Sequence, residues 1–558
     1  MNLLLKEYLS LLKESNELDK LIPNLLLAMN IKPISRAQIG VRQFGVDIAA
    51  VGVDPETKLK TLFLVTIKQG NITRSDWNAS EQGIRESLDE IKDVYLLNSV
   101  DPQNSQLPVK IILCTGGDID QNVLPNWNGY IRQNTIQNRE YDFWGGDKLA
   151  PLISKYLLSE HLLAEELRSP FRKSLALIGD SDYDCSDFYD LSRQLIIEPN
   201  FGDFRKDSNR KKVIKALNTL NLCTNIIFYW AQNEDNLKQA MKCAERALLY
   251  SWHVVRQTEL VTKPTIVSAF TEIHLTLAKV QKAYFEKLRP HTKVENGLCG
   301  YSRFSILEGL NLFEQLGFLS NAGIMASELA ISLNKPELAK DYIEGVCDFI
   351  NNHKAVNSPL YDSHIIEIFI AFEFLLLNGL DNFVRSWLVE IVKYSTFAYR
   401  LKGSHFPIYN DSYEDLISLC ITGDIQKEDL MVLSTLYAAL LQLCIAKGWK
   451  SEFSTVREYL ECFDKCDLQV WYPCENTDDY IYVSNAGYES GNTDAPITYE
   501  EPFEDMREAM KAFKETNYNT PNMKITALED GWNALPLIAS RHFRTPILPH
   551  YWEKYLPV

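Results

Sequence analysis

The sequence predicts a multidomain protein that combines an α/β domain with a long α-helical part. Three observations lead to this fold class. The chain has 558 residues, which is too many for one hydrophobic core. Strand-like segments gather in the first third, and helical periodicity dominates from about residue 205 to 465. We therefore expect an α/β domain at residues 1–175, an α-helical domain at 176–465 and a small α+β cap or docking region at 466–558.

The bulk composition is typical of a folded protein without a membrane anchor. Hydrophobic residues make up 46% of the chain and charged residues 23%. No apolar run approaches the roughly 20 residues that span a bilayer. The start of the chain lacks the basic and apolar regions of a secretory leader. The scattered cysteines are typical of reduced core thiols, so we expect a cytoplasmic protein with no membrane partner.

The net charge of −17 limits how the chain can contact nucleic acid. It results from 57 basic and 74 acidic side chains. Such a chain is no general nucleic-acid coat, so any contact needs a local basic surface or a partner. The charge favours protein partners. A phosphate loop with Gly-Lys-Ser/Thr is absent from the sequence, so a nucleotide-driven step would need a separate ATPase chain.

The N-terminal part alternates between helix and strand patterns. Apolar residues from Leu18 to Met29 have helical spacing, with Ser15 and Asn16 as cap candidates. The later elements that we expect are strands at 46–53, 59–68, 109–114 and 139–144, a helix capped by Ser80, a helix through Trp127 and Ile131, and a helix capped by Asp147. The order α-β-β-α-β-α-β-α predicts an α/β domain.

The first two strands form a hairpin that brings an acid and a lysine together. Asp47 lies at the start of the first strand, and Thr66 and Lys68 lie at the end of the second. Because side chains alternate along a strand, Thr66 and Lys68 project from one face. The plain alternatives are a hairpin-edge acid paired with Arg42 and a lysine that faces solvent.

These residues carry a resemblance to a known family. Residues 14–70 resemble the Mrr-type branch of the PD-(D/E)XK nucleases, in which a helix carries a Glu, a Gly-x-Asp follows, and a strand ends in (Glu or Gln)-x-Lys. Glu17 lies at the start of the second helix, Gly45-Val46-Asp47 matches the acid motif, and Thr66-Ile67-Lys68 matches the strand end. The segment 141–149 is similar to nuclease-like domains of bacterial anti-phage proteins. The resemblance implies a restriction-endonuclease-like fold, endonuclease activity and a role in antiviral defence.

The chemistry that this resemblance implies is metal-dependent hydrolysis of a phosphodiester, of DNA foremost. Asp47 is a hard oxygen ligand suited to Mg²⁺ or Mn²⁺, and Glu17 can supply a second carboxylate. Lys68 would stabilise the charge that develops on the phosphate. Further contacts with flanking phosphates or bases are expected from Gln69, Arg74 and Trp77, although packing against the crossover helix is the alternative for Trp77.

Thr66 departs from the family pattern, because a hydroxyl is a weak metal ligand compared with a carboxylate. Either the missing acid comes from the next helix, with Glu86 and Glu90 as candidates, or the site binds without cutting. The second case would make the domain a catalytically inactive recognition or scaffold module.

The remaining sequence predicts an irregular, tetratricopeptide-like helical array followed by an aromatic-rich C-terminal region. Segments 324–333 and 338–350 flank the turn Asn334–Glu337, but no strict 34-residue repeat is present. We expect this array to bind a partner protein or to self-associate and thereby control the nuclease domain. A third hypothesis is a helical-repeat adaptor. Cys462, Cys466 and Cys474 could bind zinc, but no fourth ligand lies close by.

Overall fold

The protein is described by a computed structural model. It describes residues 5–6, 9–10, 12, 14–35, 44–79, 83–156, 165–300, 305–401, 407–409, 411–422, 431–463, 466–484, 496, 501–518, 520 and 523–557. The predicted cap Ser80 and the predicted ion-pair partner Arg42 lie outside these residues. Residue contacts divide the chain into two compact units, Met1–Leu177 with Arg193–Asn233 and Ile178–Ser192 with Glu234–Val558. The three expected domain boundaries stay a prediction.

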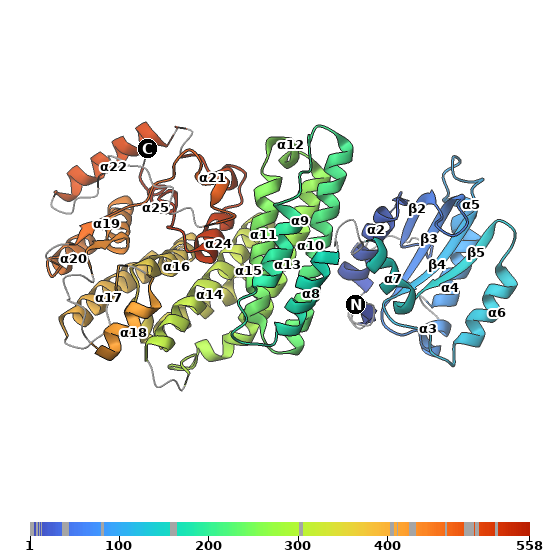
Figure 1. The fold of residues 1–558 in the computed structure, drawn as a ribbon, viewed down its shortest axis with the longest axis horizontal. Coiled ribbons are helices and arrows are strands. Elements are labelled where there is room, and N and C mark those ends of the chain that lie inside the picture. The colour runs from blue at the N-terminus through green and yellow to red at the C-terminus, as the bar shows by residue number, and fades with distance from the viewer. Residues whose placement is uncertain are drawn as a thin grey trace. The chain divides into compact units, whose positions relative to one another are not determined.

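The first unit contains a five-stranded mixed sheet whose strands follow one another in sequence order (Figure 1). Its strands are β1 (Lys32–Pro33), β2 (Ile48–Val53), β3 (Lys60–Lys68), β4 (Val109–Thr115) and β5 (Arg139–Trp144). β1, β2 and β3 are antiparallel neighbours, whereas β3, β4 and β5 run parallel. The predicted hairpin and the two later strands are therefore confirmed. The short edge strand β1 was not predicted.

Helices cover both faces of this sheet. The helices of the first unit are η1 (Glu14–Leu18), α2 (Asp19–Ala28), α3 (Arg74–Asn78), α4 (Ile84–Glu90), η2 (Ile91–Tyr95), α5 (Leu96–Asn98), α6 (Leu124–Asn134), α7 (Gly146–Tyr156), α8 (Glu165–Leu177) and α10 (Asp207–Asn233). α3, α4 and α6 share a buried apolar core with one sheet face. α2 and α7 contact each other, and they also contact β2 and β5, respectively. The predicted cap at Ser15 and Asn16 is wrong, because η1 is a π-helical turn that continues directly into α2.

A buried lysine ties the hairpin turn to the parallel strands. Lys110 on β4 is 4% exposed. Its ammonium group lies 3.0 Å from Asp54, 2.7 Å from Glu56 and 3.1 Å from Glu140. Removing one partner of a buried ion pair leaves an uncompensated charge, which costs several kcal/mol. The network therefore holds the turn after β2 against β4 and β5.

The described residues of the second unit form helices and one short pair of strands, β6 (Leu433–Ser434) and β7 (Asp467–Leu468). Its helices are α11 (Leu237–Val255), α12 (Thr258–Val261), α13 (Pro264–Thr292), α14 (Ser305–Leu333), α15 (Glu337–Asn352), η3 (Lys354–Asn357), η4 (Asp362–His364), α16 (Ile365–Leu377), α17 (Asp381–Arg400), α18 (Tyr413–Thr422), α19 (Thr435–Lys447), α20 (Lys450–Leu460), α21 (Thr477–Tyr480), α22 (Phe503–Asn517), α23 (Thr526–Glu529), α24 (Ala534–Phe543) and α25 (His550–Glu553), while α9 (Ser186–Ile196) is shared between the units. α14 and α15 flank the predicted turn, but α14 has 29 residues and α15 has 16, so the pair is unequal.

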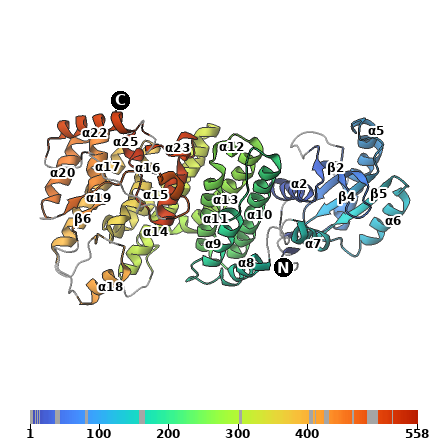
Figure 2. The ribbon, with the colours of Figure 1, turned by 45° about the horizontal axis from the view of Figure 1, so that its top comes forward.

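The C-terminal region packs on its own helical array (Figure 2). α24 contacts α11, α14 and α16, and both α22 and α25 contact α19. Among the described helices, α14 is apolar and long enough to cross a membrane by length and composition, which differs from the expectation that no apolar run approaches that length. However, 67% of its most apolar window is buried inside the protein. Its apolar character is therefore explained by its place in the core, and the cytoplasmic location stays a prediction.

Gly45, two residues before Asp47, allows the hairpin to approach α4. Its φ is +78°, and a Cβ atom there would lie 2.2 Å from the carbonyl oxygen of Ser87 on α4. Both the backbone conformation and the close approach require a residue without a side chain. The Gly-x-Asp motif thus has a structural reason for its glycine.

We predict that Gly45→Ala lowers the unfolding free energy of the first unit by roughly 2 kcal/mol or more, because it adds strain and a backbone clash. The matched control is Gly129→Ala in α6, where a Cβ meets nothing within 4 Å and the helix gains about 0.5–1 kcal/mol. Urea titration with hydrogen exchange of β2 and β3 peptides in the full chain measures both. Equal protection of wild type and Gly45→Ala would contradict the prediction.

Candidate functional site

The hairpin places the predicted acid and lysine at one end of the sheet. Ile48 on β2 pairs with Val65 on β3, so Asp47 lies opposite Thr66. The backbone N–H of Ile67 donates to Asp47 Oδ2 at 2.7 Å. This bond fixes the carboxylate against the last residues of β3, where Lys68 ends the strand. The two strands therefore position Asp47 and Lys68 through their backbones.

Glu14 is the helix carboxylate that the structure brings into this neighbourhood. It lies half-buried on η1, which contacts β3. Burial raises the pKa of Glu14 above its ordinary value of 4.5, Lys68 lowers it, and Asp47 and Asp19 raise it. Mutual influence of this kind requires that these four side chains lie near one another. Sequence reasoning assigned the role to Glu17, which lies three residues later in the same turn, and that assignment stays a prediction.

The π-helical turn explains why Glu14 and Asp19 were missed. Residues five apart point in different directions in a regular α-helix, whereas a π-helical turn closes between residues i and i+5. η1 spans Glu14–Leu18 and Asp19 begins α2. Insertions of this type are frequent at functional sites. Helix propensities and apolar periodicity do not predict a π-helical turn, so the sequence gives no sign of it.

Asp47 resists ionisation in the folded protein. Burial is the main reason that its pKa lies above the ordinary value of 3.8. The hydrogen bond from Ile67, the charge of Lys68 and the hydroxyl of Thr66 lower that pKa, while Asp19 raises it. Thr66 itself is 1% exposed. A cation beside Asp47 would relieve the desolvated negative charge, as Lys68 does in part.

The donor set suits a hard divalent cation that keeps water ligands. Among the described residues, no three His, Cys, Asp or Glu side chains form a ready-made metal cage. The same holds for Cys462, Cys466 and Cys474, the possible zinc ligands. Mg²⁺ is commonly held by one or two carboxylates together with waters and substrate phosphates. Asp19 Oδ1 is a buried oxygen that has no hydrogen-bond partner within the described part of the chain. Buried polar atoms normally have a hydrogen-bond partner, and a bound cation is one group that would satisfy this oxygen.

The three predicted substrate-contacting residues lie in different environments. Gln69 and Arg74 are exposed, after β3 and at the start of α3. Trp77 is 3% exposed and packs edge-on against Trp127 and Tyr130, with ring centroids 6.3 and 5.9 Å away. Its ring partners therefore lie on α6, and it shares a buried core with Ile84 and Leu88 of the crossover helix α4. Trp77 is a packed core residue, while the contacts of all three residues with substrate stay predictions.

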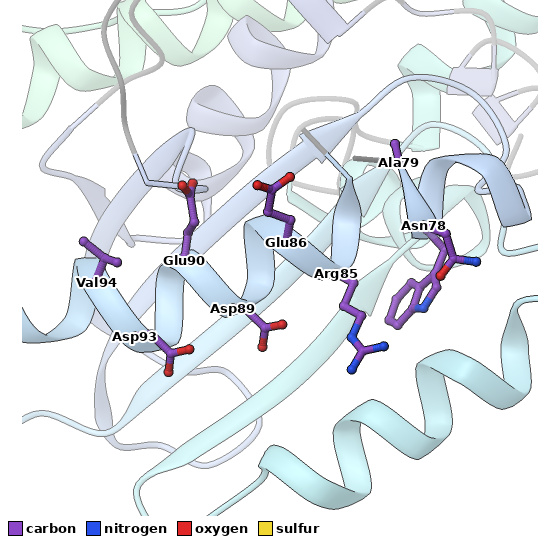
Figure 3. Close-up of a pocket in the computed structure, with 9 residues that line it drawn as sticks. Asn78, Ala79, Arg85, Glu86, Asp89, Glu90, Asp93 and Val94 are labelled. Carbon is purple, nitrogen blue, oxygen red and sulfur yellow. The ribbon is translucent and has the colours of Figure 1, made fainter. Parts of the chain in front are cut away.

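Glu86 and Glu90 line a separate depression on α4. Figure 3 shows both side chains on one side of the helix, with Asp89 and Asp93 on the other. The depression has a volume of about 490 Å³ and is also lined by Trp77. Neither glutamate is among the groups that shift the pKa of Asp47 most. Asp19 of α2 raises the pKa of Asp47, and Asp47 and Lys68 both shift the pKa of Glu14 on η1.

Comparison of the chain with protein-family models, with curated proteins and with solved structures finds no match. The described residues offer three carboxylates and one ammonium group at the end of β3: Glu14, Asp19, Asp47 and Lys68. This set carries an excess of negative charge. An arrangement of this kind attracts cations, although no three of the described side chains form a ready-made metal cage.

We predict that Asp47→Asn stabilises the first unit near neutral pH. A raised folded-state pKa contributes stability below the ordinary value of 3.8, and that contribution is lost as pH rises through the folded-state pKa. Asparagine keeps the bond from Ile67 without a buried charge. The gain, on the order of 1 kcal/mol or less, should shrink towards pH 3. Denaturation between pH 3 and 8 measures it.

The control for this prediction is Glu86→Gln, which removes an exposed carboxyl in the same unit. Surface changes of this type usually stay within about 0.5 kcal/mol. If Asp47→Asn were less stable than wild type at neutral pH, the assignment of Asp47 as a strained, desolvated carboxylate would be wrong.

Proposed function

We propose that the first unit is a PD-(D/E)XK-type, metal-dependent endonuclease domain that hydrolyses phosphodiester bonds, of DNA foremost. The observation that carries the proposal is the shared electrostatic neighbourhood of Glu14, Asp47 and Lys68 at the end of the hairpin. The strand arrangement supports it, because an antiparallel hairpin is followed by a helical crossover and a parallel strand, the order that we expect of restriction-endonuclease-like folds.

Each residue has a defined task in this proposal. Glu14 and Asp47 would hold the cation, and Thr66 lies opposite Asp47, where its hydroxyl lowers the pKa of that carboxyl. When bound, Mg²⁺ or Mn²⁺ neutralises phosphate charge and lowers the pKa of a coordinated water. Lys68 stabilises the negative charge that develops on the phosphate oxygens. Gln69 and Arg74, exposed beside β3, contact flanking phosphates.

The second unit is the controlling part in this proposal. It is a tetratricopeptide-like helical array that binds a partner protein or a second copy of the chain, with a separate ATPase as one such partner. The resemblance of residues 141–149 to nuclease-like domains of anti-phage proteins supports a role in bacterial antiviral defence. A cytoplasmic location fits that role.

Thr66 favours a second candidate function, a nuclease-like domain that recognises nucleic acid without cutting it. It is buried and lies opposite Asp47, where the family pattern has a carboxylate or an amide. The described residues contain no three-ligand cage. In this case the cation affinity of Glu14 and Asp47 alone would be too low to assemble the reacting groups.

We predict that Asp47→Asn, Lys68→Ala and Glu14→Gln each reduce cleavage at least about 100-fold. Glu14 and Asp47 supply the negative charge that would hold the cation, and Lys68 supplies the positive charge that stabilises the phosphate. Glu17→Gln, from the same helical turn, should reduce it far less. Full-length protein is incubated with plasmid DNA and with RNA, in Mg²⁺, Mn²⁺ or EDTA. Cleavage that survives in EDTA or in Asp47→Asn would overturn the proposal, and Glu17→Gln as the more damaging variant would return the role to Glu17.

We predict that Thr66→Glu lowers the Mg²⁺ concentration needed for half-maximal cleavage, because it adds a hard ligand beside Asp47. Thr66→Gln is the matched control, since it has similar volume and no charge. Cleavage that appears only in Thr66→Glu would favour the recognition module as the natural function. An unchanged Mg²⁺ requirement in Thr66→Glu would show that position 66 does not face the cation.

A further inference from the structure

The start of α10 carries the densest basic segment in an otherwise acidic chain. Residues 205–215 contain six Lys or Arg side chains and one Asp, against a net charge of −17 for the whole protein. A basic run is most often a solvated helix face. The positions of these side chains and their ion pairs show whether the segment could also bind an anionic partner.

Three lysines of this segment lie on one face of α10, which we call the lysine face: Lys211, Lys212 and Lys215. Lys211 and Lys212 are exposed, and Lys215 is half-buried. The opposite face of the helix, with Val213, Ala216, Leu217 and Leu220, is buried. Helical periodicity therefore directs three ammonium groups to the same side. Arg210 is used differently, since its guanidinium group donates to the carbonyl oxygens of Phe204 and Arg205 at 3.0 and 2.7 Å.

The charges of the lysine face are poorly compensated. Lys211 pairs with Asp207 at 2.9 Å, but both side chains are largely exposed, and such pairs contribute little. Within the described part of the chain, no carboxylate forms an ion pair with Lys212 or Lys215. Burial alone lowers the pKa of Lys215. Like charges three and four residues apart destabilise a helix, so this face carries a cost that an anionic partner would remove.

We propose that the lysine face is a contact surface for the phosphate backbone of nucleic acid. This inference rests on the proposed function, because that function makes nucleic acid the anionic partner. Lysine is a point charge that binds phosphates without reading the sequence. A lipid surface fits less well, because a membrane-binding helix exposes apolar side chains beside its lysines, whereas the apolar face of α10 is buried. The surface would add general affinity and leave cleavage to the hairpin site.

The test compares K211Q/K212Q/K215Q with K335Q/K340Q/K354Q, which removes three exposed lysines elsewhere. Glutamine has a helix propensity close to that of lysine, so both full-length variants should fold, as circular dichroism checks. Binding to a DNA duplex and to an RNA duplex is measured by fluorescence anisotropy in EDTA, over a series of salt concentrations. Vesicles rich in phosphatidylserine form a third arm.

The lysine-face variant should bind nucleic acid at least about tenfold more weakly at 0.1 M salt. Its slope of log K against log salt should be smaller by about 2 to 3, since each lost phosphate contact removes about 0.9. The control variant should match wild type. Equal affinity and slope in both variants, no binding of either duplex by wild type, or a loss confined to vesicles would overturn the inference.

The outcome is separable from that of the nuclease proposal. Asp47→Asn should retain duplex binding in EDTA. Lysine-dependent binding without any metal-dependent cleavage would support the lysine face and count against the endonuclease. Metal-dependent cleavage together with unchanged duplex binding in K211Q/K212Q/K215Q would support the endonuclease and count against the lysine face.

Discussion

The hydrogen bond from the backbone of Ile67 to Asp47 sets the geometry of the whole site. It joins the acid at the start of β2 to the end of β3 at 2.7 Å, so that acid and Lys68 share one end of the hairpin. Several remote features secure this arrangement. Gly45 lets the hairpin lie against α4, and Lys110 anchors the opposite end of the hairpin to the parallel strands. The carboxylate is held in place at the cost of partial desolvation, which is the condition under which it gains most from a cation.

The strands of the hairpin and the helical turn before α2 make different contributions to the site. The strands position Asp47, Thr66 and Lys68 through ladder hydrogen bonds, whereas Glu14 comes from a single π-helical turn before α2. Burial is the main cause that raises the pKa of both Glu14 and Asp47, and neighbouring carboxylates raise both further. Under the proposed function, cation binding and phosphate binding would be linked, because a bound cation would offset the negative charge that repels the phosphate. The proposed contact of the lysine face with nucleic acid would reduce the same repulsion at longer range.

The sequence predicted those features that depend on interactions between residues close together in the chain, and it did not predict those that depend on packing or on local departures from regular geometry. β3 and β5 were predictable because alternation and β-branched residues act within one strand. The hairpin register places Asp47 opposite Thr66, and so brings it to the end of β3 that carries Lys68. The role of Glu14 was not predictable, since it depends on a local departure from α-helical geometry. β1 is too short to show a pattern, and the length of α14 is hidden by polar residues such as Asn311 and Glu314. The sequence left two alternatives for Trp77, contact with substrate and packing in the core, and only the tertiary structure shows that it is packed.

The most direct test of the central claim is where a divalent cation binds. A crystal of the full chain grown with Mn²⁺ locates the ion by anomalous scattering. We predict a peak within coordination distance of carboxylate oxygens of both Glu14 and Asp47, and its loss in Asp47→Asn. A peak that lies instead between Glu86 and Glu90, or no peak at the end of β3 at saturating Mn²⁺, would contradict the account.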